Sequence, residues 1–171
     1  MSNSIQKNNI LLRINKLFPI ILLFCSVLNE FDFNNLGLKY FSFNFSYILI
    51  FYYSLKKSES LGYGLIFIAG LFNDVVLGIP LGISSLVFLL LCGAAAYLRN
   101  ITLQPNLMKD WIYFLITILT INSIAFMILT FIFDYQIDFF YQMINMGFTF
   151  LFYIVFYYLF NLIERILIGR N

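Results

Sequence analysis

The residue whose type and setting most clearly call for chemistry is Asp74, a carboxylate inside the apolar stretch Gly70–Gly82, GLFNDVVLGIPLG. A charge in the middle of a hydrocarbon layer costs on the order of 3 kcal/mol, and less near its edge. A Gly-x-Pro-x-Gly break, Gly78 to Gly82, follows within about one helical turn. Glycine permits unusual backbone dihedrals, and Pro80 suits the first turn of a new helix. We therefore predict two helices joined by a tight reversal at this break.

Such a reversal would bring the start of the second helix beside the carboxylate. The first turn of a helix has unpaired backbone N–H groups and a partial positive charge, so it stabilises a nearby anion. The candidate donors are the amides of Gly82, Ile83 and Ser84. We expect Asp74 to join the two helices and to set the angle between them.

Two other roles for Asp74 stay open at this point. It could lie in the outer headgroup region as a solvated charge, or it could belong to a proton or cation path, since ionisable residues in membranes often do. A proton path needs a second buried acid or base. The apolar segments that follow offer only amides in the place of such a partner: Asn122, Gln142 and Asn145.

Composition shows why a single carboxylate stands out. Of 171 residues, 62% are hydrophobic and 11% charged, and the mean hydropathy is +0.91, whereas soluble domains carry about 25% charged residues. The chain is therefore predicted to be an integral membrane protein.

Histidine is absent, which excludes imidazole metal sites and Ser-His-Asp triads, and a net charge of +2 does not indicate nucleic-acid binding. We expect no catalytic site, cofactor or metal, and we expect Cys25 and Cys92 to be buried and inert.

Six segments are apolar enough to be considered as spans, because crossing a hydrocarbon layer of roughly 30 Å takes about 20 residues. The first two are short. Basic residues precede the first, as in a signal peptide, but no small-residue cleavage site follows it, so we interpret it as an uncleaved span. Together the segments predict an all-α, single multi-pass membrane domain over residues 1–171. They are residues 17–33, 40–55, 61–79, 81–98, 111–133 and 139–163.

Charge placement predicts the orientation of these spans. Acidic residues dominate the alternate connections, which hold Glu30, Asp32, Asp134 and Asp138, with Lys39 as the exception. By the positive-inside rule, both termini are then cytoplasmic. Lys56 and Lys57 could also meet a filament or anionic lipid, although topology alone explains them. The basic residues on the cytoplasmic side are Lys7, Arg13, Lys16, Lys56, Lys57, Arg99, Lys109, Arg165 and Arg170.

Small residues gather on the third and fourth segments. Small side chains let membrane helices approach closely, so these positions predict a packing seam, either internal or open to a partner helix. They are Gly62, Gly64, Ala69 and Gly70 on the third segment, and Gly93, Ala94, Ala95 and Ala96 on the fourth.

The run Gly64–Leu91, GLIFIAGLFNDVVLGIPLGISSLVFLLL, resembles the signature of the bacterial rod shape-determining MreD family. That signature is an apolar helix ending in G-L-x-x-D, a short Gly/Pro turn with Leu-Gly, and a second apolar helix. The chain lacks the Arg-Pro or similar pair that such proteins commonly show before the second span, where only Lys39 stands. With Gly78 added, the matching positions are our candidate structural and interaction residues: Gly70, Leu71, Asp74, Gly78, Pro80, Leu81 and Gly82.

The resemblance implies a non-enzymatic scaffold of the cell-wall elongation machinery in the bacterial inner membrane. It implies as partners an MreC-like bitopic protein, an MreB-like filament, and the peptidoglycan polymerase and transpeptidase of the sidewall. It also implies a fold distantly similar to the substrate-binding subunits of energy-coupling-factor transporters.

The alternative is the substrate-capture subunit of a vitamin or small-solute importer. That function needs a cavity open to the outside with convergent polar groups. The residues that could supply them are scattered and lack a charged anchor: Asn122, Ser123, Gln142 and Asn145.

Overall fold

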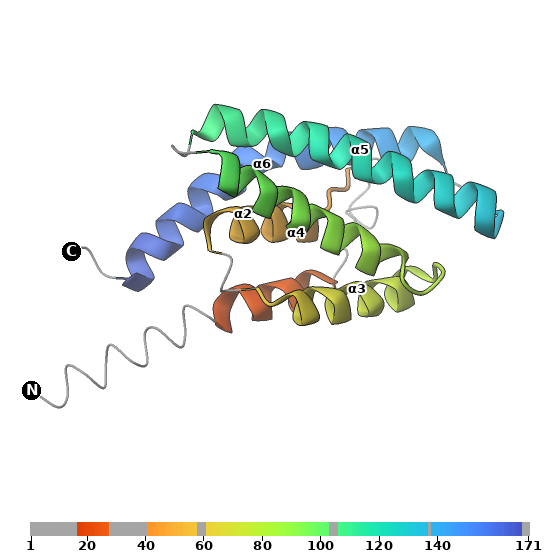
Figure 1. Cartoon of the computed structure of the whole chain (residues 1–171), viewed down its shortest axis with the longest axis horizontal. Helices are drawn as coiled ribbons and strands as arrows, with labels where there is room; N and C mark the ends of the chain where they lie inside the picture. Colours follow the sequence, from red (N-terminus) through yellow and green to blue (C-terminus); the bar gives the residue numbers. More distant parts are fainter. Residues whose placement is uncertain (1–16, 28–40, 58–60, 103–105, 137, 169–171) are drawn as a thin grey trace, which may run out of the picture.

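The computed structural model describes residues 17–27, 41–57, 61–102, 106–136 and 138–168, and these residues form six helices (Figure 1). The all-α prediction is confirmed for them. The helices are Leu17–Val27, α2 (Phe45–Lys56), α3 (Tyr63–Leu77), α4 (Ile83–Ile101), α5 (Leu107–Phe133) and α6 (Phe139–Ile168).

Three of the described helices, α4, α5 and α6, are long and apolar enough to cross a membrane. The helix Leu17–Val27 and α3 are apolar but shorter. The 12 residues of α2 extend about 18 Å at 1.5 Å per residue, well short of a hydrocarbon layer of roughly 30 Å. Membrane character is therefore evident in the helices, while six full crossings stay a prediction.

The second apolar segment becomes helical later than the sequence predicted, at Phe45 instead of residue 40. The reason lies in α6. The backbone N–H of Asn44 donates to Thr149 Oγ1 (2.9 Å), and the side-chain amide of Asn44 donates to Asn145 Oδ1 (2.8 Å). The chain just before α2 is therefore bonded to α6 and does not extend the helix.

The other boundaries differ by a few residues. The helix α5 begins at Leu107 instead of 111, because the side chain of Asn106 accepts from the N–H of Met108 (3.1 Å) and caps the helix. The helices α4 and α6 continue to residues 101 and 168, beyond the predicted 98 and 163. Residues 28–33 and 40, which the prediction assigned to spans, lie outside the described residues.

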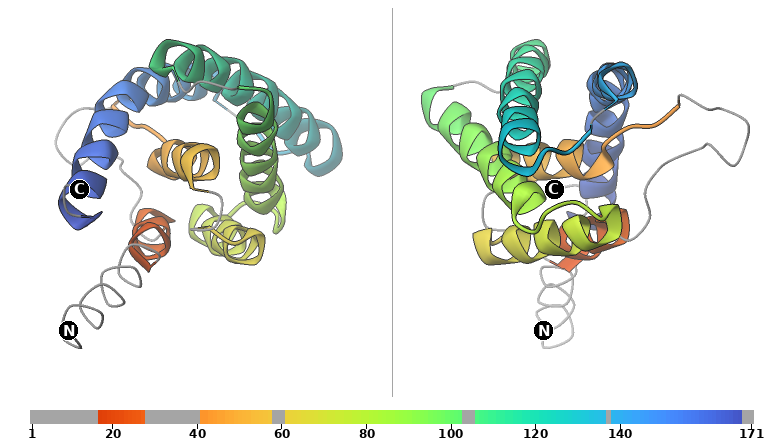
Figure 2. Two further views of the ribbon diagram at one scale, coloured as in Figure 1. Left: turned by 60° about the vertical axis from the view of Figure 1, so that its left-hand side comes forward. Right: turned by 90° about the vertical axis from the view of Figure 1, so that its right-hand side faces the viewer.

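The centre of the molecule is α2. Figure 2 shows it enclosed by the other helices, and its residues from Ile48 to Tyr52 are fully buried. It packs mainly against α4 and α6. A helix that is apolar on all sides is buried on all sides, and here protein, not lipid, surrounds it.

Aromatic side chains join α6 to its neighbours. Phe43 stacks on Phe152 with ring centroids 4.7 Å apart, and Phe45 meets Phe156 edge-on at 4.8 Å. The indole of Trp111 stacks on Phe150 at 4.3 Å and donates from Nε1 to the carbonyl of the same residue (2.9 Å). Such ring pairs contribute roughly 0.5–1.5 kcal/mol each beyond their buried area. The aromatic residues of α6 that face the molecule therefore act in helix packing.

The two cysteines differ. Cys92 is buried as predicted, and Ser54 Oγ donates to its sulfur (3.2 Å). The prediction for Cys25 is wrong, because that residue is exposed. It belongs to the helix Leu17–Val27, which lies at the periphery of the molecule and turns one side outward (Figure 2).

Candidate functional site: the Asp74 turn between α3 and α4

The turn between α3 and α4 depends on two glycines in the left-handed region of backbone space. Gly78 ends α3 with φ +65°, and its N–H and that of Ile79 both donate to the carbonyl of Asp74. Gly82 stands immediately before α4 with φ +103°. Left-handed backbone costs other L-residues roughly 1–2 kcal/mol each, so these positions favour glycine. The predicted reversal is confirmed.

The carboxylate of Asp74 binds the start of α4. Oδ2 accepts the N–H of Gly82 (2.6 Å) and Oδ1 accepts the N–H of Ser84 (2.7 Å). These are two of the three amides named from the sequence. Bonds from backbone N–H groups at a helix start to a carboxylate are charge-assisted and short. Because Asp74 is fully buried, it is not a solvated headgroup charge, and that alternative is wrong.

Below the turn, α3 and α4 touch at Gly70. A Cβ at this position would collide with the backbone of Ser85, so only glycine allows the observed approach. The hydroxyl of Ser85 donates to the carbonyl of Phe67 (2.9 Å), and Asn73 Nδ2 donates to Ser84 Oγ (2.8 Å). The pair Ser84–Ser85 thus helps to join the helices. From the sequence, Ser84 was expected to contribute only its backbone amide, and the role of the two hydroxyl groups was missed. The presence of two serines in the first turn of an apolar helix could have indicated it.

The remaining signature residues take no part in the carboxylate contact. Leu71 and Pro80 are half-buried, whereas Leu81 projects from the turn with 69% of its surface exposed. The structure therefore brings Gly70, Asp74 and the two turn glycines into one unit and leaves Leu81 outside it. We call this unit the Asp74 clasp: Gly70, Asp74, Gly78 and Gly82, with Ser84 and Ser85.

The predicted small-residue seam is internal only in part. Ala69 and Ala95 are fully buried, and Gly70 makes the contact with α4. At Gly62, Gly64 and Gly93, however, a Cβ would meet no atom of the other described parts of the chain within 4 Å. These three glycines face the surroundings of the molecule.

A second buried acid exists that sequence reasoning missed. Asp110, at the start of α5, is only 2% exposed, and its Oδ2 has no hydrogen-bond partner in the described part of the chain. The predicted spans 81–98 and 111–133 leave Asp110 in the connection between them. The feature that could have indicated its burial is that Asp110 directly precedes Trp111, the first residue of an apolar run. The start of α5 and the Asp74 turn lie at opposite ends of the molecule (Figure 1), so these two acids do not form a pair.

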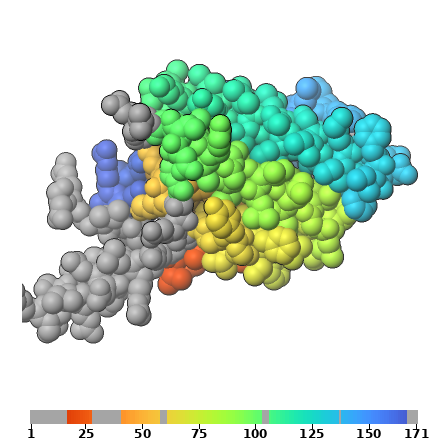
Figure 3. Space-filling view, in the orientation of Figure 1, coloured from red at the N-terminus to blue at the C-terminus, as the bar shows by residue number. Residues whose placement is uncertain are grey.

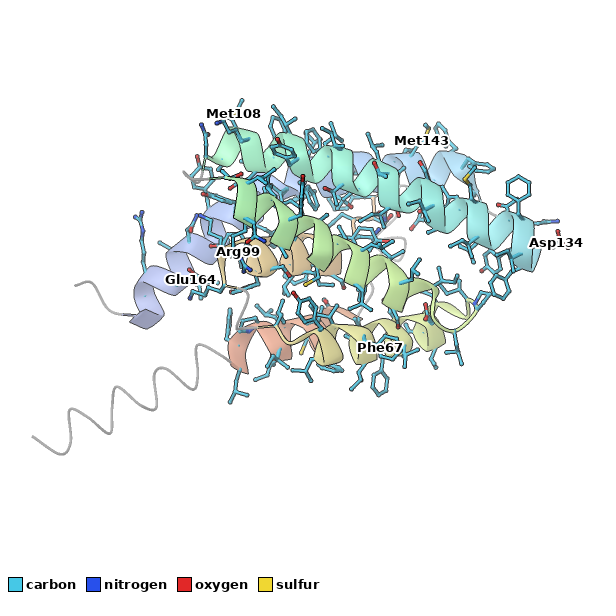
Figure 4. The ribbon with its side chains drawn as sticks, viewed as in Figure 1. Phe67, Arg99, Met108, Asp134, Met143 and Glu164 are labelled. Atoms are coloured by element: carbon cyan, nitrogen blue, oxygen red, sulfur yellow. The ribbon has the colours of Figure 1, made fainter. Side chains whose placement is uncertain are left out.

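The two lysines at the end of α2, Lys56 and Lys57, have partners in α6. Lys56 Nζ donates to the hydroxyl of Tyr157 (2.8 Å) and lies 4.5 Å from the centre of its ring. Lys57 pairs with Glu164 at 3.3 Å. Figure 4 places Glu164 near Arg99 at one end of the molecule and Asp134 at the other. Arg99 and Asp134 thus lie at opposite ends of the molecule, with the acidic Glu164 at the end of Arg99, and the orientation of the spans stays a prediction.

The four polar residues of the importer alternative do not share one environment. Ser123 is exposed, and its hydroxyl donates to the carbonyl of Leu119 (2.8 Å). The other three, Asn122, Gln142 and Asn145, line a common cavity. Among the residues that the structure describes, no group of His, Cys, Asp or Glu is arranged to hold a metal ion.

Comparison with known proteins supports one family. Residues 13–163 match the family described as rod shape-determining protein MreD. No curated protein and no solved structure matches the chain significantly. The match covers most of the chain and contains the whole Asp74 clasp, so the protein belongs to the MreD family of rod shape-determining proteins.

Proposed function

We propose that this chain is a non-enzymatic scaffold that docks the transmembrane helix of an MreC-like protein and so helps to position the peptidoglycan polymerase and transpeptidase of the sidewall. Membership of the MreD family assigns it to the rod-shape machinery. The docking step and the partners, including an MreB-like filament, are our proposal. The observation that carries it is an outward face of small residues on two helices that the Asp74 clasp holds together.

The proposed docking surface consists of the outer faces of α3 and α4 around Gly64 and Gly93. The two helices lie side by side, with α5 beyond them (Figure 3). From the contact between Gly70 and Ser85, Gly64 and Gly93 lie about 9 Å and about 12 Å along their helices at 1.5 Å per residue. They are therefore at similar depth. Glycines with open space around them let a further helix approach closely, and close packing drives helix association in lipid.

The proposed location is the bacterial inner membrane, with six spans and both termini in the cytoplasm. The separation of Arg99 from Asp134 along the molecule (Figure 4) and the positive-inside pattern support this orientation. The beginning of the helix Leu17–Val27 and the end of α6 lie at the same end of the molecule (Figure 1), as an even number of crossings requires.

The test uses leucine substitutions at glycines where a new side chain would meet no other part of the described structure. Gly64→Leu and Gly93→Leu place bulk on the proposed docking surface, and Gly147→Leu places the same bulk on α6, where a Cβ also meets no atom within 4 Å. Tagged full-length protein is purified from its own membranes in mild detergent, and the associated proteins are identified by mass spectrometry. We expect the MreC-like partner to be lost with the first two variants and retained with the third.

Two results would contradict the proposal. Retention of the partner by Gly64→Leu and Gly93→Leu would remove α3 and α4 as its docking surface. Recovery of a membrane coupling subunit with paired ATPases, in place of wall-synthesis proteins, would favour a substrate-capture subunit of an importer. Matched membrane levels of the three variants are the control for folding.

A further inference from the structure

A cavity of about 340 Å³ lies among α2, α4, α5 and α6, at the end of the molecule that holds the Asp74 turn. Small-molecule sites commonly measure about 300–1,000 Å³, so the cavity is large enough for a small ligand. Asn73 and Ser84, which are bonded to each other beside the Asp74 clasp, form part of its wall. The clasp therefore helps to shape this cavity.

Six residues with side-chain amides contribute to the polar part of the wall. They come from α3, α5, α6 and the connections that flank α2 and α6. Asn44 and Asn145 are bonded to each other at 2.8 Å, and Asn145 Nδ2 also donates to Ser42 Oγ (2.8 Å). The amide residues are Asn44, Asn73, Asn122, Gln136, Gln142 and Asn145.

The amide of Asn122 is the feature that points to a ligand. The residue is only 5% exposed. Its Oδ1 accepts a long bond from the hydroxyl of Tyr47 (3.3 Å), but its buried Nδ2 has no partner in the described part of the chain. Buried polar groups in folded proteins almost always have hydrogen-bond partners, so this exception indicates an acceptor outside the described residues. The wall of a cavity is where such an acceptor can bind.

The charge of the wall restricts the ligand. Asp138 is the single charged residue among the described residues that line the cavity. Its Oδ1 already accepts the N–H groups of Phe140 (3.0 Å) and Tyr141 (3.2 Å) at the start of α6. Because no lysine or arginine lines the described wall, an anion would lose its hydration without gaining a counter-ion. An uncharged ligand avoids that loss.

We propose that this cavity binds an uncharged small molecule of about the size of a sugar, carrying hydroxyl or amide groups, with one of its oxygens accepting from Asn122 Nδ2. Hydroxyl groups donate and accept, as side-chain amides do. The rings of Phe43, Phe88 and Phe126, which also line the cavity, offer apolar surface to the C–H faces of such a molecule. This binding site is independent of the docking surface proposed on α3 and α4.

The test compares two probes that differ by one phosphate. N-acetylglucosamine and N-acetylglucosamine 1-phosphate are titrated into the purified full-length protein in detergent micelles, and binding is followed by saturation-transfer NMR and calorimetry. We expect saturable binding of the neutral sugar and binding at least about tenfold weaker for the phosphate. We expect Asn122→Ala to weaken binding of the neutral sugar at least about tenfold, because it removes the donor. Ser123→Ala, on the next residue of the same helix but facing outward, is the matched control and leaves binding unchanged.

Other outcomes would overturn the proposal. These are no saturable binding of the neutral sugar up to about 10 mM, equal or tighter binding of the phosphate, or an Asn122→Ala variant that binds as well as the parent. If Asn122→Ala lacks a cooperative unfolding transition, Gln142→Ala replaces it, since that side chain is only half-buried. Partner recovery by mass spectrometry is measured on the same variants. Loss of sugar binding with the partner retained separates this site from the scaffold function.

Discussion

Replacing Asp74 by alanine removes the acceptor for two backbone N–H groups at the start of α4. In the intact protein these bonds measure 2.6 and 2.7 Å, to Gly82 and Ser84. The carboxylate is fully buried and Ser84 is 6% exposed. The N–H of Ser84 is therefore shielded from water, whereas Gly82 is half-buried and its N–H is closer to water; lipid provides no acceptor for either.

The size of the effect follows from the number of unsatisfied donors. An unsatisfied buried N–H costs about 1–3 kcal/mol, so two of them cost at most about 2–6 kcal/mol, and the half-buried Gly82 contributes less than Ser84. Relief from burying a carboxylate offsets part of this cost. We expect Asp74→Ala to lower the free energy of unfolding by about 2–4 kcal/mol. Asp74→Asn keeps one carbonyl oxygen but loses the charge and the second acceptor, so we expect a loss of about 1–2 kcal/mol.

The measurement is the free energy of unfolding in mixed micelles of a mild detergent and dodecyl sulfate, followed by circular dichroism. Val75→Ala is the matched control, because Val75 is the next residue of α3 and is 68% exposed. The expected order of stability is parent and Val75→Ala, then Asp74→Asn, then Asp74→Ala. An Asp74→Ala protein as stable as the Val75→Ala control would refute the argument that this carboxylate joins α3 to α4.

Three further predictions concern the contact between α3 and α4, the turn that joins them, and an ion pair between Lys57 and α6. Gly70→Ala forces a methyl group into the backbone of α4 and should lower the free energy of unfolding by about 1–3 kcal/mol. The control Gly147→Ala, with open space around it, should leave the free energy of unfolding unchanged or raise it by up to about 1 kcal/mol. The same micelle titration compares the two variants, and equal stabilities would contradict the close contact. Gly78→Ala, at φ +65°, should cost about 1–2 kcal/mol and lower the thermal unfolding midpoint, which an unchanged midpoint would disprove. Glu164→Gln breaks the partly exposed ion pair with Lys57 and should lower the free energy of unfolding by less than about 1 kcal/mol. This loss of stability should shrink in high salt. A loss that does not depend on salt would mean that the ion pair does not stabilise the contact between Lys57 and α6.

Sequence reasoning succeeded where the determining physics is local. The class of protein follows from the amount of apolar surface, which composition measures directly. The turn follows from Gly78, Pro80 and Gly82, whose backbone preferences depend on each residue alone. The bonds from Gly82 and Ser84 to Asp74 join residues 8 and 10 positions apart. Once the turn is predicted, the chain has little freedom to place them elsewhere.

Sequence reasoning was incomplete where hydropathy has two meanings. It did not show that the 12 residues of α2 are enclosed by protein, and whether α2 crosses the membrane stays a prediction. A side chain that avoids water is equally satisfied by lipid or by neighbouring helices, so hydropathy does not distinguish the two. The same ambiguity explains Cys25, which is exposed, and Asp110, which looked like part of a connection and is buried.

The sequence by itself thus determined the membrane class, the helical content and the Asp74 turn. Only the tertiary structure decided that α2 occupies the centre and that Asn44 and Asn145, 101 positions apart, meet in one cavity wall with Asn122. The reason is physical: contacts across such separations depend on how whole helices pack, and each helix presents several faces of nearly equal hydrophobicity to its neighbours and to lipid.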